Sequence, residues 1–535
     1  MSSQLIDALL SPACYSHQTG TIRLLETHIS WVLLTGSFAY KIKKPVNYGF
    51  LDFSSLAQRR FYCEEELRLN SRFSDELYLA VVPITGSVDE PRVDGTGPVL
   101  EYAVKMQQFA QENLLDALAE RGQLQERDIA ALAKKLADFH TDVAAKAEPG
   151  LAKKQDPKKR LEYGSVHSIH HAALENFRQI EPLLSDKTAL DDLERLRCWT
   201  EQQAKDLAGV FEQRQRSGWI RECHGDLHLA NIARIDGHIT LFDCLEFNPE
   251  LRWIDTQSEL AFLLMDLEEK HLPALANNLL NSYLEYTGDY PGLQVLNFYK
   301  VYRAMVRAKV KLLSLSADQT TASMTAARTE YGRYIDLALS YLDVPSPFLA
   351  IMHGVSGTGK STVAAVVAGA VGAIRLRSDV ERKRLFGLSP EAKSGSGIGV
   401  NIYSAEASRR TFAALVESAR TLLALSYPVL VDATFLAEKW RRLFAELAAA
   451  KGVPFVILDC HASAQTIRER LQHRQEAETS VSEAGLEIMQ HQLQKAEPLT
   501  RQEKNVVVHI NTEEEVDVKD LQIFLKSHAA ADTPE

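Results

Sequence analysis

The segment GVSGTGKS, residues 354–361, constrains this chain more strongly than any other stretch, because it follows the spacing G-x-x-x-x-G-K-S. An apolar run, FLAIMH, comes directly before it, and the helix-forming run KSTVAAVVAGAV overlaps its end. A strand, a glycine-rich loop and a helix in this order let backbone N–H groups and a helix N-terminus surround phosphate groups. The sequence therefore predicts a phosphate-binding loop at the edge of a parallel sheet.

The residues after 347 alternate between strand patterns and helical patterns. The strand patterns are AIRLRSD, PVLVDAT, PFVILDC and NVVVHINT, and helical patterns separate them. Repeated strand–helix units with apolar strands are typical of a parallel sheet that is covered by helices on both faces. We therefore expect residues 346–535 to form a three-layer α/β domain, which begins at the proline-containing segment LDVPSP.

The loop motif also assigns chemical roles. Lys360 is predicted to reach the β- and γ-phosphates of ATP, and Ser361 to bind Mg²⁺. Asp432, at the end of the strand pattern PVLVD, is predicted to serve the same magnesium site. The residues expected to contact the nucleotide are Gly354, Val355, Ser356, Gly357, Thr358, Gly359, Lys360, Ser361 and Thr362.

The segment RLRSDVERKRL places Asp379 after a strand and Arg382 three residues later. Here the region resembles the P-loop kinases of the polynucleotide-kinase and zeta-toxin group, within the wider class of AAA-like ATPases. The resemblance implies that Asp379 acts as the base for an acceptor hydroxyl and that Arg382 contacts substrate or phosphate. The structural alternative is a helix N-cap in this segment, and both interpretations can hold together, with Ser378 as the cap and Asp379 as the base.

Two arginines follow the strand PFVILDC, in the segment IRERLQHRQ. Small P-loop kinases carry a lid with arginines at this place, so Arg470 and Arg474 are candidates for contacts with the nucleotide phosphates. The two residues are four positions apart and share one helical face. A solvated helix face is the alternative interpretation.

A second set of chemical residues lies in CHGDLHLANI, residues 223–232. Asp226 can orient or deprotonate a hydroxyl, Asn231 can bind a metal ion, and Asp243 in the following strand ITLFDC can be the second metal ligand. These residues make the chain resemble the aminoglycoside phosphotransferase family, which shares the protein-kinase-like fold. His224 is interpreted as a structural brace of this loop.

The resemblance implies an ATP-binding lysine on the third strand and a glutamate on the following helix. FAYKIKKP supplies Lys41, with Lys43 on the same face, and we choose Glu65 from the three glutamates of CEEELRLN. The hairpin LLETHISWVL contains no glycine, so a glycine-rich loop over the phosphates is not expected. TIRLLETHIS and WVLLTGSFAYKIKK are predicted as adjacent strands, and residues 1–345 as an α+β protein-kinase-like domain with a helical second lobe.

Composition limits the classes of function. The 535 residues carry a net charge of −11, and the part from residue 346 onward holds 22 basic and 23 acidic side chains, so general nucleic-acid binding is not expected. No run reaches the ~18 apolar residues of a membrane helix, and the scattered cysteines favour a reducing cytoplasm.

The sequence thus predicts a cytoplasmic, ATP- and Mg²⁺-dependent phosphotransferase with two kinase domains, each acting on a hydroxyl group of a small molecule. In the first alternative, residues 1–345 are a non-catalytic binding or regulatory module. In the second, the C-terminal domain acts on nucleic-acid 5′ ends.

Overall fold

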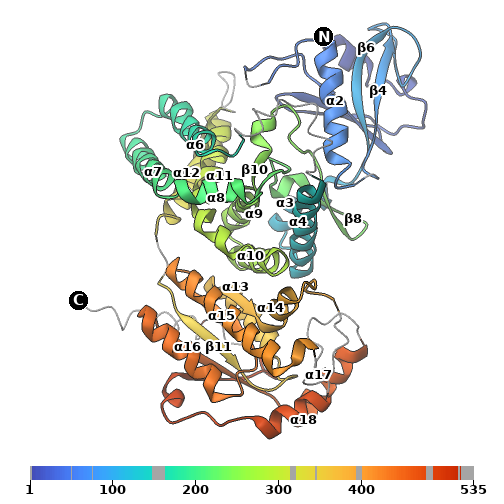
Figure 1. The fold of residues 1–535 in the computed structure, drawn as a ribbon. Coiled ribbons are helices and arrows are strands. Elements are labelled where there is room, and N and C mark those ends of the chain that lie inside the picture. The colour runs from blue at the N-terminus through green and yellow to red at the C-terminus, as the bar shows by residue number, and fades with distance from the viewer. Residues whose placement is uncertain are drawn as a thin grey trace. The chain divides into compact units, whose positions relative to one another are not determined.

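The structure is a computed structural model of the chain (Figure 1). It describes residues 3–49, 51–74, 76–146, 163–313, 321–343, 346–392, 401–476, 486–515 and 519. The chain divides into two compact units: unit 1 comprises Met1–Asp266 and Phe298–Lys309, and unit 2 comprises Leu267–Asn297 and Val310–Glu535.

Unit 1 begins with a six-stranded antiparallel sheet in the order β1-β2-β3-β6-β4-β5. Helix α2 packs against β4 and β6, and a buried cluster that includes Leu33, Tyr40 and Ile42 fills one side of the sheet. The strands and helices of this part are α1 (Ser3–Ala8), β1 (Arg23–Glu26), β2 (Ser30–Leu34), β3 (Phe38–Lys43), α2 (Leu56–Asn70), β4 (Tyr78–Gly86), β5 (Pro91–Val93) and β6 (Val99–Gln107).

One strand prediction in this sheet is wrong. The segment WVLLTGSFAYKIKK is not a single strand, because it folds back on itself as the hairpin of β2 and β3. Gly36 turns the chain with a φ of +102°, which favours glycine, and Thr35 N donates to Phe38 O at 2.9 Å. As a result Lys41 lies on the third strand, as the family resemblance implies.

The rest of unit 1 is mainly helical, as the sequence predicts, with two small antiparallel ladders, β7 with β10 and β8 with β9. Among the helices of the described residues, none is long and apolar enough to cross a membrane. The elements are α3 (Leu115–Glu120), α4 (Glu126–Lys146), α6 (Val166–Ile180), α7 (Lys187–Asp206), α8 (Ala208–Arg216), β7 (Ile220–Glu222), β8 (Ile232–Ile235), β9 (His238–Leu241), β10 (Trp253–Asp255), α9 (Thr256–Glu269) and α11 (Leu293–Leu313), of which α9 and α11 reach into unit 2.

Unit 2 contains the predicted parallel sheet, with the strand order β12-β13-β11-β14-β15. Its elements are α10 (Pro273–Thr287), α12 (Thr321–Ser340), β11 (Leu349–His353), α13 (Lys360–Val371), β12 (Ile374–Arg377), α14 (Ser378–Leu385), α15 (Ala405–Ala424), β13 (Val429–Asp432), α16 (Glu438–Lys451), β14 (Phe455–His461), α17 (Ala464–Glu476), α18 (Leu486–Lys495) and β15 (Val507–Asn511).

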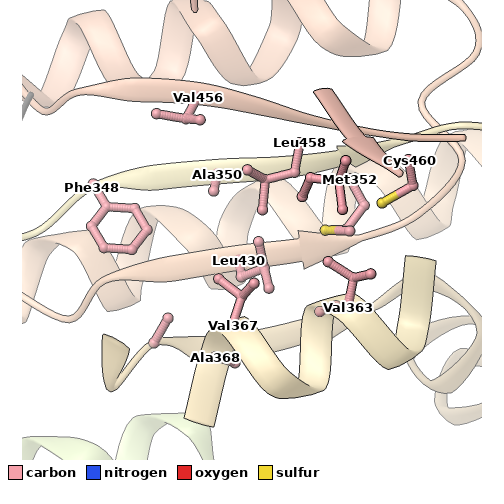
Figure 2. Packing of buried hydrophobic residues seen from close by; sticks show 13 residues of the cluster. Phe348, Ala350, Met352, Val363, Val367, Ala368, Leu430, Val456, Leu458 and Cys460 are labelled. Carbon is pink, nitrogen blue, oxygen red and sulfur yellow. The ribbon is translucent and has the colours of Figure 1, made fainter. Parts of the chain in front are cut away.

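Both faces of this sheet are buried. Figure 2 shows side chains of β11, β13 and β14, among them Met352 and Leu430, facing Val363 and Val367 of α13. The alternate side chains point to the opposite face, and Ile351 is fully buried there. Burial on both faces is typical of a parallel sheet between helices and explains the continuous apolar runs of the sequence.

The predicted domain boundary at residue 345 stays a prediction, since residues 344 and 345 lie outside the described part of the chain. The compact units also divide the chain elsewhere. The segment Leu267–Asn297, which contains α10, groups with the parallel sheet and not with unit 1.

Two candidate active sites

The first candidate site is formed by the loop that precedes β8. Asn231 Nδ2 donates to Asp226 O at 2.9 Å and lies 3.4 Å from Asp226 Oδ2. Because Phe242 N donates to Asn231 O at 3.1 Å, the chain after β9 returns beside Asn231. This pairing brings Asp243, the residue after Phe242, to the same end of the β8–β9 ladder as Asn231.

His224 braces this loop, as the sequence analysis interpreted it. Its Nε2 donates to Phe242 O at 2.8 Å, and its carbonyl oxygen accepts from Leu245 N at 3.0 Å. Burial lowers the pKa of the fully buried imidazole below its ordinary value, so the ring stays neutral and serves as a hydrogen-bond donor. His224 therefore ties the two halves of the site together without carrying charge.

The glycine of the loop is required by geometry. Gly225 has a φ of +89°, and a Cβ atom there would lie 2.9 Å from Leu251 O. Its N–H and that of His224 both donate to Glu259 Oε1, at 3.0 and 2.5 Å. Glu259 is held in turn by His140 Nε2 at 2.7 Å, so a buried carboxylate on α9 fixes the loop backbone.

Two other charged residues near the start of α9 also serve internal ion pairs. Arg252 Nε lies 3.1 Å from Glu222 Oε1, and Arg214 Nε lies 2.6 Å from Asp255 Oδ2. The sequence favours an internal salt-bridge network over a catalytic role for Arg252, Asp255 and Glu259. They stabilise the frame on which the loop rests.

Asp226 is ionised in this environment. His228 Nε2 lies 3.6 Å from Asp226 Oδ2, and the side chain of Asp226 is 44% exposed. Desolvation opposes the charge, but His228, through its charge and a hydrogen bond, and Arg307 lower the pKa of Asp226 well below its ordinary value. An ionised, accessible carboxylate can accept a hydrogen bond or a proton from a hydroxyl group.

Lys41 lies within ion-pair distance of two acidic residues. Its Nζ is 2.8 Å from Glu66 Oε1 and also pairs with Asp243. Burial works against the positive charge, but the surrounding carboxylates raise the pKa of Lys41 well above its ordinary value. The lysine is therefore charged and joins the third strand to the predicted metal ligand.

The choice of Glu65 as the partner of Lys41 is wrong, because Glu66 occupies that position. Glu66 is fully buried, whereas Glu65 lies on the flank of α2 and pairs with Arg68 at 2.9 Å. Lys43 also binds Glu66, at 2.7 Å, and Glu246. Three consecutive glutamates on a weakly amphipathic helix leave the helical phase ambiguous, which explains the error of one residue.

Glu246 is a buried member of this cluster that the sequence analysis missed. It follows Asp243 by three residues in DCLEF, and an acidic residue next to apolar neighbours was the only available signal. The hairpin of β1 and β2, as expected, contains no glycine; the hydroxyl of Thr27 closes its turn by accepting from Ser30 N at 2.9 Å.

The second candidate site is the loop between β11 and α13. Gly354 has a φ of +130°, and a Cβ atom there would lie 2.6 Å from Cys460 O, so only glycine fits. Thr358 Oγ1 and Lys360 Nζ both donate to Val355 O, at 2.9 and 2.6 Å, and hold the loop in a compact turn. The strand, loop and helix follow in the predicted order.

A cavity of about 470 Å³ brings most of the predicted residues of unit 2 together. Its lining includes Ser356, Gly357, Gly359, Lys360, Ser361, Asp379, Arg382, Asp432 and, from α18, Gln492. Arg382 Nη1 lies 3.2 Å from Asp379 Oδ1, and its guanidinium stacks 4.9 Å from the centre of the Tyr403 ring. Among the remaining loop residues, Thr362 lines a separate cavity of about 770 Å³.

The helix-cap alternative for Asp379 is not observed. In the described residues, α14 begins at Ser378 itself and its N-cap, Arg377, makes no side-chain capping bond. Asp379 therefore does not cap the helix, and it lines the cavity. Asp432, at the end of β13 and 6% exposed, lines the same cavity.

Arg470 is not in the lining of this cavity, but its Nη1 lies against Gly359, where an added Cβ would be 3.1 Å from it. Its guanidinium donates to Thr512 Oγ1 at 2.8 Å and to Thr512 O at 2.7 Å, and it lines the 770 Å³ cavity beside Gly359. The side chain of Arg474 lies outside the described residues. The sequence analysis missed α18, from which Gln492 Oε1 accepts from Ser356 N at 2.8 Å.

The donor sets of both sites suit Mg²⁺. Asn231 and Asp243 offer amide and carboxylate oxygens in unit 1, and Ser361 and Asp432 offer hydroxyl and carboxylate oxygens in unit 2. Magnesium prefers oxygen ligands and shares them with phosphate groups. The residues at both sites therefore fit a magnesium ion by the chemistry of their oxygen donors.

The chain therefore has a protein-kinase-like α+β fold, which is followed by a P-loop α/β fold. Residues 349–499 match the model of a family described as an AAA domain. Over 450 residues the chain is 29% identical to an uncharacterized protein of Mycobacterium tuberculosis (strain ATCC 25618 / H37Rv), covering 84% of this chain and 86% of that protein.

Several solved kinases are similar in fold. Amicoumacin kinase hAmiN, in complex with AMP-PNP, Ca²⁺ and Ami, is 11% identical with a TM-score of 0.39, over 63% of this chain and 93% of that one. Wild-type aminoglycoside 2′-phosphotransferase-IIIa, in its GDP complex, is 13% identical with a TM-score of 0.36, over 62% and 99%. The APS kinase CysC of Mycobacterium tuberculosis, in complex with AMPPNP and APS, is 21% identical with a TM-score of 0.24, over 34% and 97%.

Proposed function

We propose that this protein is an ATP- and Mg²⁺-dependent phosphotransferase with two active sites, each of which phosphorylates a hydroxyl group of a small molecule. The observation that carries the proposal is the shared cavity of Lys360, Ser361, Asp379 and Asp432 in unit 2. A phosphate-binding loop, a metal site and an acidic residue within one cavity are the parts that phosphoryl transfer needs.

In unit 2, Lys360 and the loop amides would bind the β- and γ-phosphates, and Ser361 and Asp432 would hold the metal ion. Bound Mg²⁺ neutralises charge on the phosphate oxygens. Asp379 receives the proton of the acceptor hydroxyl. The oxygen of that hydroxyl bonds to the γ-phosphorus at the same time. The bond from that phosphorus to the β–γ bridging oxygen breaks, and ADP leaves.

In unit 1, the same balance of bonds applies with different residues. Asp226 orients the acceptor hydroxyl and takes its proton, and its lowered pKa keeps it ionised for that role. Asn231 and Asp243 are the metal ligands, and Lys41, held by Glu66, contacts the nucleotide phosphates. The ion pairs of Lys41 support this assignment because they bring Glu66 and Asp243 to the same lysine.

Two observations favour narrower functions. The hairpin without glycine over the unit 1 site favours a binding or regulatory role for that unit. The Asp379-x-x-Arg382 pair favours the 5′-hydroxyl end of a nucleic acid as acceptor in unit 2. Residues 346–535 carry nearly equal numbers of basic and acidic side chains, so their net charge does not favour nucleic-acid binding.

The test is a transfer assay of the full chain with γ-labelled ATP, Mg²⁺ and a mixture of small hydroxyl metabolites, with RNA and DNA oligonucleotides in parallel. We expect labelled small molecules that fall into two groups, one lost in Asp226→Asn and the other in Lys360→Ala. If only oligonucleotide ends are labelled, the acceptor of unit 2 is a nucleic-acid end and not a small molecule. If Asp226→Asn leaves the labelling of every product unchanged, unit 1 is not catalytic.

A further inference from the structure

Two arginines of the edge strand β12 face the same side of the sheet. Arg375 and Arg377 are two positions apart, while Ile374 before them and Leu376 between them point into the core. Of the two, Arg377 lines the 470 Å³ cavity, and its neighbour in the sheet register is Asp432. Arg377 Nε lies 3.8 Å from Asp432 Oδ2.

Helix α10 holds both arginines through one carboxylate. Glu285 Oε1 accepts from Arg375 Nη2 at 2.6 Å and Nε at 3.1 Å, and its Oε2 accepts from Arg377 Nη1 at 2.8 Å. The Glu285 side chain is 9% exposed. Burial opposes its charge, but the two guanidinium groups lower the pKa of Glu285, which therefore stays ionised. A single buried carboxylate thus fixes the position of Arg377.

The docking of α10 on the sheet is specific. Asn281 accepts from Arg375 N at 2.6 Å and donates to Ala373 O at 3.0 Å, so its amide pairs with the edge strand as a neighbouring strand would. Asn277 donates to Ala368 O of α13 at 2.6 Å. α10 and α13 pack side by side (Figure 1). These bonds hold the backbone of α10, and with it Glu285, in a fixed place relative to β12.

We propose that Arg377 contacts the phosphoryl group in transfer at the unit 2 site, and that Glu285 of α10 is the residue that positions it. The inference rests on the proposed kinase function of unit 2. A guanidinium in the same cavity as the loop lysine suits a phosphoryl group, because it offers several donors in one plane and remains charged. Glu285 occupies one side of that guanidinium and leaves its position fixed when phosphate binds.

Arg375 provides a matched control. It shares the Glu285 carboxylate with Arg377 and donates from Nη1 to the backbone oxygen of Ser361 at 3.3 Å, but its side chain is absent from the lining of the cavity in the described residues. Replacing either arginine by Gln leaves Glu285 with one cationic partner, so both variants should lower the melting temperature by similar amounts. Only the variant at 377 should change the handling of a phosphoryl group.

The experiment measures binding of MgADP, alone and with aluminium fluoride as a planar mimic of the transferred group, to the full chain. Binding at the unit 2 site is the part that Lys360→Ala removes. We expect Arg377→Gln to bind ADP within about 3-fold of wild type and to lose about 10-fold or more of the extra affinity that aluminium fluoride adds. Arg375→Gln should keep both affinities.

Two further variants sharpen the result. Arg377→Lys keeps the charge but not the two-sided contact, and should show a smaller loss in the same direction. Glu285→Gln should also reduce the aluminium fluoride effect with little change in ADP affinity. An aluminium fluoride effect that is equal in wild type, Arg377→Gln and Arg375→Gln would overturn the inference and leave the kinase function intact. If Lys360→Ala removes no nucleotide binding, the proposed function of unit 2 fails and the inference with it.

Discussion

The unit 1 site and the unit 2 site bring together the same kinds of groups, a lysine, carboxylates and oxygen ligands for a metal, by different means. In unit 2 a continuous loop of eight residues supplies most of the phosphate-binding groups from its backbone. In unit 1, Lys41, Glu66 and Asp243 come from segments far apart in the chain and meet through buried ion pairs. Sites of the second kind depend on tertiary packing, and substitutions in them should cost both activity and stability.

The largest expected effects separate the two sites by activity. Lys360→Ala should lower phosphoryl transfer at unit 2 by at least about 10²–10³-fold, because it removes a charge next to the transferred group. Asp226→Asn should lower transfer at unit 1 by about 10²–10⁴-fold. Initial rates with γ-labelled ATP in the full chain check both values. A variant that abolishes both activities at once would contradict independent sites.

The ion pairs of unit 1 should show in the free energy of unfolding. Glu66→Gln leaves Lys41 and Lys43 with one buried partner fewer, and should destabilise the protein by about 3–5 kcal/mol. Glu65→Gln, one residue away, removes a pair with Arg68 near the surface and a longer approach to Arg252 at 3.7 Å, and should cost less than about 1 kcal/mol. Urea unfolding measures both. If both variants lose the same free energy of unfolding, Glu66 is not the main partner of Lys41.

Acid should weaken the frame of the unit 1 site. Desolvation opposes the charge of Glu222, but Arg68, Arg72 and Arg252 lower its pKa from 4.5 to about 2. The native carboxylate thus binds its proton less readily than the unfolded one. It contributes about 3 kcal/mol above pH 5, and this contribution is lost as the pH falls from about 5 to 2.

The comparison for Glu222 is a series of urea unfolding curves between pH 7 and pH 3. Wild type should lose stability more steeply with acid than Glu222→Gln, which has no carboxylate to protonate at this position. Parallel slopes for the two proteins would mean that the three arginines do not depress the pKa of Glu222.

The smallest expected effect concerns the backbone of the Asp226 loop. Gly225→Ala forces a Cβ atom to within 2.9 Å of Leu251 O at a φ of +89°, and should cost about 1–3 kcal/mol. Gly209→Ala is the control, since Gly209 lies in α8 with open space around it and alanine favours helix there by about 1 kcal/mol. Thermal unfolding distinguishes them. A Gly225→Ala variant as stable as wild type would show that the loop can shift away from Leu251.

These differences also explain what the sequence could predict. The loop from Gly354 to Ser361 was predictable because its glycines, its lysine and its flanking strand and helix are neighbours in sequence. Asp226 and Asn231 were predictable for the same reason. Glu66 was missed because the pairing with Lys41 depends on the rotation of α2, and one residue changes the facing side by about 100°.

The role of Glu285 was beyond local patterns. The sequence predicts only that this region is helical, and nothing near Glu285 in the chain points to Arg375 and Arg377, which lie 90 and 92 positions away. Its location in unit 2 follows from packing of α10 on the edge of the sheet. For the same reason, fragments that end at residue 345 would separate α10 from the strand that it covers.

The most direct test of two nucleotide sites is the stoichiometry of AMP-PNP binding to the full chain with Mg²⁺, measured by calorimetry. We predict two nucleotides per chain in wild type and one in Lys360→Ala, with the remaining site provided by Lys41, Asn231 and Asp243. One nucleotide per wild-type chain and none in Lys360→Ala would contradict a nucleotide site in unit 1, and with it a phosphotransferase that has two active sites.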